Sequence, residues 1–247
     1  MEPKQSNLIK YGDTFNLGNH VLLCGDCRDE KLIHDFLKDK KIRAVVTDPP
    51  YGVKYVESKR SICKVTIDKN IQNDDISSEA SYEDFTEKWI NPLLPHLEEK
   101  NSFYIFNSDK LLTSLIAGIK KQNVNFSQLL IWIKNNSVLG RKDYLIQHEL
   151  IVNGWYKRHL FRKSKDQSVL FCPKPSKSPL HPTMKPISLL RRLILNSSNI
   201  GDCIYDPFGG SGSTLIASEQ TKRKCLMVEI DSCYCETIIK RFKDYER

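Results

Sequence analysis

The chain has 247 residues, of which 40% are hydrophobic and 28% are charged, as in a globular domain with a core. This composition excludes a mainly disordered chain, a collagen-like repeat and a disulfide-rich miniprotein. The longest apolar run, 129–133, is far shorter than the roughly 18–20 residues of a membrane-spanning helix, and the first residues lack the apolar stretch of a secretory signal. An excess of 38 Lys and Arg over 30 Asp and Glu favours a polyanionic partner, with simple solubility as the alternative.

Short apolar runs alternate with helix-like segments, which predicts an α/β domain with a mostly parallel sheet. In chain order, we expect a hairpin (13–23), a helix (29–38), a strand (44–47), a helix from 82 to 89 and beyond, a strand (103–106), a helix (110–120), strands (129–133 and 150–152), a helix (187–195), a strand (203–205), a helix (214–219), a strand (225–228) and a closing helix (234–242).

Eight cysteines are spread along the chain, and Cys24 and Cys27 have the spacing of half a zinc site or of a redox pair. A zinc site needs a second close pair, and Cys233 and Cys235 are too close together for the usual spacing. Because Cys24 also ends an apolar stretch, it fits the buried end of a strand. We therefore expect reduced thiols in a cytoplasmic protein, and no metal.

Two polar stretches, 54–75 and 134–180, interrupt the pattern of strands and helices. The second is rich in Lys, Arg and His, with aromatic residues between them. A solvated insertion is one interpretation, but basic residues interleaved with aromatic ones favour contact with nucleic acid. The candidate DNA-contacting residues are Lys134, Arg141, Lys142, Arg158, Arg162 and Lys163.

The first chemical cluster is Asp48-Pro49-Pro50-Tyr51, directly after a buried strand. Open parallel sheets place their sites beyond the carboxyl ends of strands, and two prolines in series fix the backbone there. The Asp48 carboxylate and the Pro49 carbonyl are then two acceptors for the hydrogens of an exocyclic amine, whose nitrogen becomes more tetrahedral and nucleophilic. Tyr51 offers a ring on which a base stacks. A strand-ending turn with a stray aromatic residue is the structural alternative.

The second cluster is a glycine-rich loop between a strand and a helix, where backbone approaches a ligand closely. It lacks the lysine of a P-loop and the third small residue of a dinucleotide fingerprint. Glu229 ends the next strand, where a carboxylate accepts both ribose hydroxyls. A single nucleoside that carries a carboxylate fits, as S-adenosylmethionine does; a structural turn is the alternative. The candidate cofactor-binding residues here are Asp206, Phe208, Gly210, Ser211, Gly212, Ser213, Thr214 and Glu229.

The third cluster covers residues 181–186, just before the helix expected at 187–195. Pro186 is a helix-start signal. Thr183 and Lys185 are candidates to meet the carboxylate or phosphate of a ligand, and we add them to the cofactor site. A purely structural turn is equally compatible with these residues.

Together, these clusters resemble those of the β-type amino-group DNA methyltransferases, which modify N6 of adenine or N4 of cytosine. The resemblance covers residues 8–245 and rests on residues 11–26, 48–51, 132–135, 144–149, 181–186 and 206–214. It implies a circularly permuted class-I S-adenosylmethionine-dependent methyltransferase fold, with a mostly parallel seven-stranded sheet and flanking helices. Rejoining the chain ends restores the unpermuted order and places Asp26 where the family contacts the cofactor adenine. The resemblance also implies one domain, 1–247, with a small target-recognition insertion at 134–180.

The resemblance implies methyl transfer from S-adenosylmethionine to N6 of a flipped-out adenine in double-stranded DNA, without a metal. Asp48 and the Pro49 carbonyl would hold the amine, and Tyr51 would stack on the base. Adenine is expected because Asp at the first position usually accompanies adenine in the family, although N4 of cytosine needs the same grip.

Two further alternatives stay open. A methyltransferase of RNA or protein glutamine shares an Asn/Asp-Pro-Pro-Tyr motif, but the permuted order and residues 181–186 count against it. The intact motifs count against an inactive DNA-binding regulator. A companion restriction endonuclease and a homodimer are partners that the resemblance leaves open.

Overall fold

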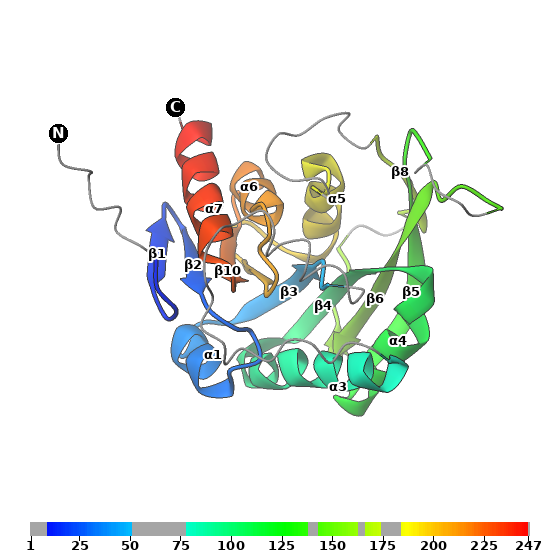
Figure 1. Cartoon of the computed structure of the whole chain (residues 1–247), viewed down its shortest axis with the longest axis horizontal. Helices are drawn as coiled ribbons and strands as arrows, with labels where there is room; N and C mark the ends of the chain where they lie inside the picture. The colour runs from blue at the N-terminus through cyan, green and yellow to red at the C-terminus, as the bar shows by residue number, and fades with distance from the viewer. Residues whose placement is uncertain (1–8, 51–77, 138–142, 163–165, 174–183, 247) are drawn as a thin grey trace.

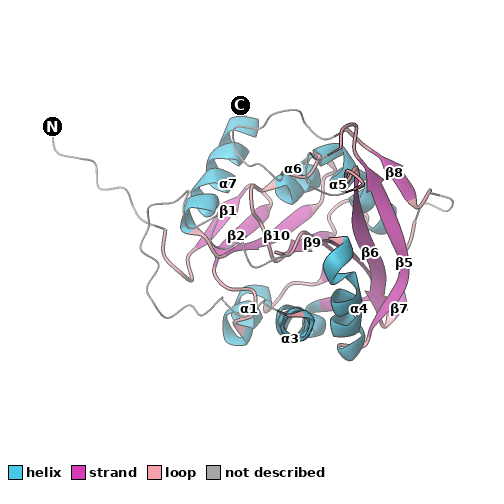
Figure 2. Cartoon of the chain, turned by 45° about the vertical axis from the view of Figure 1, so that its right-hand side comes forward, coloured by secondary structure: helices cyan, strands magenta, loops and turns pink. Residues whose placement is uncertain are grey.

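The structure is a computed structural model that describes residues 9–50, 78–137, 143–162, 166–173 and 184–246. A twisted central sheet has helices on both faces, as the sequence predicts (Figures 1 and 2). Helices α1 (Glu30–Leu37), α3 (Glu79–Ile90) and α4 (Leu112–Lys121) cover one face, and α5 (Ile187–Ser197), α6 (Ser213–Gln220) and α7 (Ser232–Tyr245) cover the other. None of the helices in the described ranges is long and apolar enough to cross a membrane.

The described residues form one ten-stranded sheet. Its strands are β1 (Thr14–Leu17), β2 (His20–Cys24), β3 (Ile42–Thr47), β4 (Leu97–Asn107), β5 (Val124–Ile133), β6 (His148–Tyr156), β7 (Arg158–His159), β8 (Val169–Phe171), β9 (Cys203–Asp206) and β10 (Lys224–Glu229). Their order is β1-β2-β10-β9-β3-β4-β6-β5-β8, with β7 paired to β4. The seven strands from β2 to β5 in this order are the expected core, in which only β6 is antiparallel to its neighbours.

The chain order confirms the expected permutation. Strands β9 and β10 come last in the sequence but lie in the middle of the sheet, between β2 and β3. The first strand of the unpermuted order therefore follows residue 200, and the catalytic strand β3 precedes it. Each expected strand and helix occurs in the structure. The largest differences are at the starts of β4 and β5, which begin at Leu97 and Val124 and not at 103 and 129.

Polar residues at the helix starts explain several of these ends. Asp29 caps α1 and Asp231 caps α7, each by accepting a hydrogen bond from a backbone N–H of the first turn. At the start of α3, Ser78 and Ser81 bond to each other's backbone in a capping box. The caps satisfy N–H groups that the helix itself leaves without acceptors.

The core consists of an apolar layer on each face of the sheet. On the α3 side, Trp89 and Phe103 are fully buried in one cluster with residues of α1 and α4. On the other side, residues of α5 and α6 pack against Trp132 and Tyr104, and a third cluster lies under α7. Burying each large apolar side chain contributes about 1.5–3 kcal/mol, so the two layers hold the strand ends in fixed positions.

The range 134–180, which we expected to be an insertion, takes part in the sheet. Strand β6 within it is a core strand, and β7 and β8 add pairs to β4 and β5. The sequence did not predict β7 or β8 because two or three residues carry no readable alternation. A target-recognition role is therefore left to the loops of this range and stays a prediction. The seven cysteines in the described ranges have free thiols.

Candidate active site

The catalytic and cofactor clusters meet where the connections of the sheet change direction. From β9 the chain passes through α6 to β10 on one side, and from β3 it passes through α3 to β4 on the other. Ligands of open α/β sheets bind outside the carboxyl ends of strands at such a point. The Thr47 hydroxyl at the end of β3 donates a 2.8 Å hydrogen bond to Oδ1 of Asp206 at the end of β9. This bond holds Asp48 beside the cofactor loop.

The loop after β9 adopts a shape that needs glycine. Gly210 and Gly212 have φ angles of +53° and +79°, in the left-handed region. Among the described residues, a Cβ added to Gly210 would have only the Phe208 carbonyl oxygen within 4 Å, at 3.9 Å. The backbone at Gly210 therefore borders open space that a ligand could fill.

Asp206 is hydrogen-bonded to the backbone of this loop. Its Oδ1 also accepts a hydrogen bond from the backbone N–H of Phe208 at 3.2 Å. Burial raises the pKa of Asp206 to about 7, although hydrogen bonds from Thr214 and Thr47 act to lower it. The carboxylate is enclosed by protein, so we assign it to loop geometry and not to direct contact with a charged ligand.

Two further carboxylates stand at the next strand ends. Glu229 ends β10 and is only 3% exposed, with Oε2 accepting the Gly210 N–H at 2.6 Å and Oε1 accepting the Asp231 N–H at 3.0 Å. Because a carboxylate has about four acceptor sites, Glu229 retains capacity for two hydroxyl groups. Asp26 follows β2, the strand that pairs with β10. Two carboxylates beside an open backbone fit a nucleoside.

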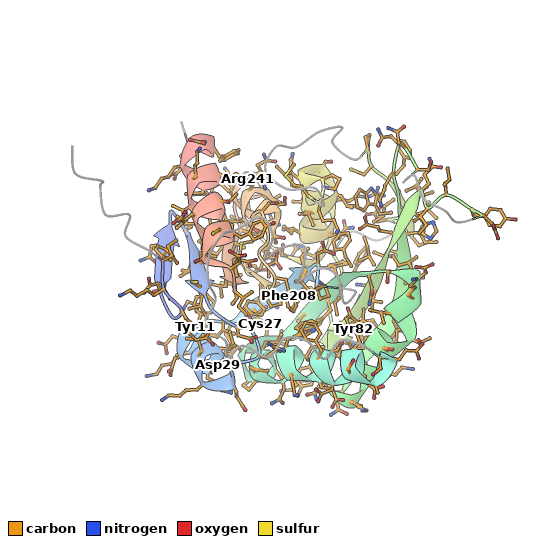
Figure 3. All side chains as sticks on the ribbon, in the orientation of Figure 1. Tyr11, Cys27, Asp29, Tyr82, Phe208 and Arg241 are labelled. Carbon is orange, nitrogen blue, oxygen red and sulfur yellow. The ribbon has the colours of Figure 1, made fainter. Side chains whose placement is uncertain are left out.

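Aromatic rings of α3 and of the glycine-rich loop lie next to Arg28, the partner of Asp26. Arg28 makes a forked contact with Asp26, with Nε–Oδ1 at 2.9 Å and Nη2–Oδ2 at 2.6 Å, and lies over the Phe85 ring. The Phe208 ring packs on Phe85 and, edge-on, on Trp89. Figure 3 shows Phe208 in the centre of the molecule, above α3. Phe208, a predicted cofactor residue, thus joins the glycine loop to the α3 layer.

Arg241 of α7 fixes the loop from the other side (Figure 3). Its Nη1 donates to the Ser211 carbonyl oxygen at 2.7 Å and lies 3.1 Å from the Ser213 hydroxyl. Burial lowers the pKa of Arg241. Ser211, Ser213 and Thr214 are buried, as loop-forming residues would be. Arg241 was not predicted, since nothing distinguishes it from the other basic residues of the last helix.

Asp48 lies against a buried lysine. The Lys185 ammonium is 2.5 Å from Asp48 Oδ2 and 3.2 Å from Glu149 Oε2. We expected Lys185 to bind a carboxylate or phosphate of the cofactor. In the structure its ammonium instead contacts Asp48 of the catalytic cluster. Glu149 was not predicted as a site residue, although it lies in a stretch that carries the family resemblance. Pro49 is buried and Pro50 half-buried at the same edge, while Tyr51 and Thr183 lie outside the described residues.

Three of the predicted DNA contacts lie in the described ranges, and the structure does not bring these three together at this end of the strands. Lys134 is buried, with its ammonium 2.8 Å from Glu149 Oε1, and so is not presented to a phosphate. Arg158 pairs with the first half of β4, and the Arg162 N–H bonds to the carbonyl of Asn196 at the end of α5. Both arginines therefore lie toward the end of the parallel strands that is opposite to Asp48. Arg141, Lys142 and Lys163 lie outside the described residues.

The comparisons with known proteins agree with this geometry. A family model described as DNA methylase, for N6 and N4 methyltransferases, matches residues 42–241. The type II methyltransferase M2.MboI of Moraxella bovis is 26% identical over 252 residues, covering 92% of this chain and 88% of that protein. The DNA adenine methyltransferase YhdJ of Escherichia coli K12 is 46% identical over 61 residues, covering 25% of this chain and 21% of that protein.

Among solved structures, the complex of M1.HpyAVI with SAM superposes with a TM-score of 0.66 at 24% sequence identity. The match covers 89% of this chain and 98% of that one, which confirms the class-I methyltransferase fold. The family match spans the catalytic strand, the buried lysine and the glycine loop. The chain therefore belongs to the N6/N4 DNA methylase family, whose members methylate DNA.

Proposed function

We propose that this DNA methylase transfers a methyl group from S-adenosylmethionine to the N6 amine of adenine in double-stranded DNA. The observation that carries the proposal is the Thr47–Asp206 hydrogen bond of 2.8 Å, which ties the amine-binding strand end to the cofactor loop. Transfer between two bound molecules requires this kind of proximity. The complex of a structural relative with SAM supports the choice of cofactor.

Glu229, Asp26 and the glycine loop are the residues that would hold the cofactor. Glu229 would accept the ribose hydroxyls, and the Arg28-bound carboxylate of Asp26 would accept from the adenine amine. The Gly210 backbone borders the open space between them. When bound, S-adenosylmethionine supplies a methyl group attached to a positively charged sulfur.

Asp48 and the Pro49 carbonyl would bind the amine of the target base. That base must leave the duplex, because its amine is paired inside the stack. As the nitrogen forms its bond to the methyl carbon it gains positive charge, and a fixed anionic acceptor stabilises that charge. Asp48 need not remove the proton, since the methylated amine loses it to water afterwards.

Adenine is favoured over cytosine by the residue type at position 48. Both amines adjoin a ring nitrogen and need the same two acceptors, so the geometry alone permits either. The family resemblance associates an Asp at this position with adenine, and the local similarity to a DNA adenine methyltransferase points the same way.

The partners follow from the substrate. A net charge of +8 favours the phosphate backbone of DNA, and a DNA substrate in turn favours the cytoplasm as the site of action. A restriction endonuclease that cuts the same sequence and a homodimer are further partners that the family resemblance leaves open.

Tritium transfer from labelled S-adenosylmethionine tests the proposal. DNA, RNA and a protein extract are offered in parallel, and we expect label in DNA alone. Asp48→Ala is the control: it should remove transfer but leave binding of S-adenosylhomocysteine intact, because the carboxylate acts on the base. Label in RNA or protein, or near-normal turnover of Asp48→Ala, would contradict the proposal.

A further inference from the structure

Four charged side chains form a continuous row that leads into the catalytic edge. In order, the contacts are Lys134–Glu149 at 2.8 Å, Glu149–Lys185 at 3.2 Å and Lys185–Asp48 at 2.5 Å. The side chains of Lys134 and Lys185 are 5% and 7% exposed, whereas that of Asp48 is 25% exposed. The row therefore runs from the interior to the point where a target base would bind.

Four separate parts of the fold contribute to this row. Lys134 follows β5, Glu149 lies in β6, Lys185 precedes α5 and Asp48 follows β3. Aromatic rings flank both cations, since the Lys185 ammonium lies 5.1 Å from the centre of the Phe106 ring and the Lys134 ammonium 5.4 Å from that of Trp132. The charges thus interact in a region largely shielded from water, where such interactions are strong.

Buried charges like these cost stability, because each loses its hydration on folding. Burial raises the pKa of Glu149, but the two neighbouring lysines outweigh it and the net shift is downward. With two lysines and two carboxylates the row is formally neutral. An apolar set of the same shape would often be as stable, so a row of charges that ends on a catalytic carboxylate calls for a functional reason.

We propose that Glu149 and Lys134 are positioning residues that hold Lys185, and that Lys185 fixes Asp48 as an anionic acceptor for the target amine. The inference rests on the proposed function, because it gives the purpose of the fixed carboxylate. Holding one oxygen of Asp48 sets the rotation of the whole carboxylate. The ammonium also favours the charged form of Asp48, which is a stronger acceptor for an amine hydrogen than the protonated form.

The charged form needs such support because other groups oppose it. Asp206 of β9 and Tyr82 of α3 interact electrostatically with Asp48, and Glu149 lies behind Lys185. Asp206 and Glu149 carry or can carry negative charge, which favours protonation of Asp48. Within the described residues around Asp48, Lys185 is the cation that counters them.

A double-mutant cycle on the rate of methyl transfer tests this coupling. Lys185→Met should lower kcat about 100-fold, as misplacement of a reacting group does. It should also move the acid limb of the pH–kcat profile to higher pH, because Asp48 loses the cation that favours its charged form. Glu149→Gln should lower kcat about tenfold by loosening Lys185. The double variant should be no slower than Lys185→Met, since Glu149 acts through that lysine.

Three further measurements separate positioning from general damage. Lys185→Arg should restore part of kcat, and the affinity for S-adenosylhomocysteine should stay unchanged in every variant. Lys120→Met, on the exposed part of α4, is the matched control. If Glu149→Gln does not fold, the pair Lys134→Met with Glu149→Gln removes one charge of each sign and enters the same cycle.

Multiplicative losses in the cycle, or an acid limb that stays in place, would overturn the inference. The assay counts methyl groups on any base, so an error in the choice of adenine would change the product and not the cycle. A wild-type chain that transfers no methyl group would instead overturn the proposed function, and this inference with it.

Discussion

Replacing Asp206 by Asn should change how the stability of the protein depends on pH. Asp206 is buried, and burial raises its pKa from 3.8 to about 7. The folded protein therefore binds a proton that the unfolded chain has lost between these two pH values. Stability from this group is present below pH 4 and falls as the pH rises toward 7, because unfolding releases the proton.

The shift of about three units limits the size of the effect. At 1.36 kcal/mol for each unit, ionisation of Asp206 costs the folded protein up to about 4 kcal/mol above pH 7. Asn keeps an oxygen that accepts from Thr47 and from the Phe208 N–H, but it cannot ionise. We expect Asp206→Asn to match the wild type near pH 4 and to exceed its stability at pH 8.

Urea unfolding of the protein without cofactor, at pH values from 4 to 8, measures this difference. Asp35→Asn, at an exposed position of α1, controls for the loss of a carboxylate in general. The difference between Asp206→Asn and the wild type should grow with pH, while that of Asp35→Asn should stay flat. A difference that is constant across this range, or that shrinks as the pH rises, would refute the assignment of a proton to Asp206.

Three other variants test the cofactor site and the face that binds DNA. Glu229→Ala should weaken binding of S-adenosylhomocysteine by roughly 1.5–3 kcal/mol in calorimetry, and an unchanged affinity would place the ribose elsewhere. Arg241→Ala should also weaken binding of S-adenosylhomocysteine, because Arg241 no longer holds the glycine-rich loop at Ser211. An unchanged affinity would show that the loop keeps its shape without Arg241. DNA affinity should fall steeply with salt, and changing Arg158 and Arg162 together to Gln should leave that slope unchanged, because both lie toward the opposite end of the strands. A flatter slope would place DNA at that end.

The sequence predicted the architecture because its signals are local. Apolar runs such as 44–47 end at prolines, and Gly210 and Gly212 occupy left-handed positions that other residues avoid. The order of the two motifs along the chain was enough to predict the permutation. Asp26, Asp206 and Glu229 stand at three adjacent strand ends, as the resemblance implies.

The contacts between distant residues could not be predicted in this way. Nothing in the local sequence shows that Lys134 is buried against Glu149, or that Lys185 reaches Asp48 across 137 positions. A lysine next to polar residues is usually exposed, so composition placed Lys134 on the surface with the other basic residues. Pairing of buried charges depends on which strands become neighbours, and only the folded sheet determines that.

Methyl transfer to N6 of adenine at the joined ends of β3 and β9 is tested most directly by digestion of methylated DNA to nucleosides, followed by mass spectrometry. DNA treated with the wild-type chain and S-adenosylmethionine should yield N6-methyladenine, and DNA treated with Asp48→Ala should not. N4-methylcytosine in its place would contradict the choice of base, and the absence of any methylated nucleoside would contradict methyl transfer to DNA.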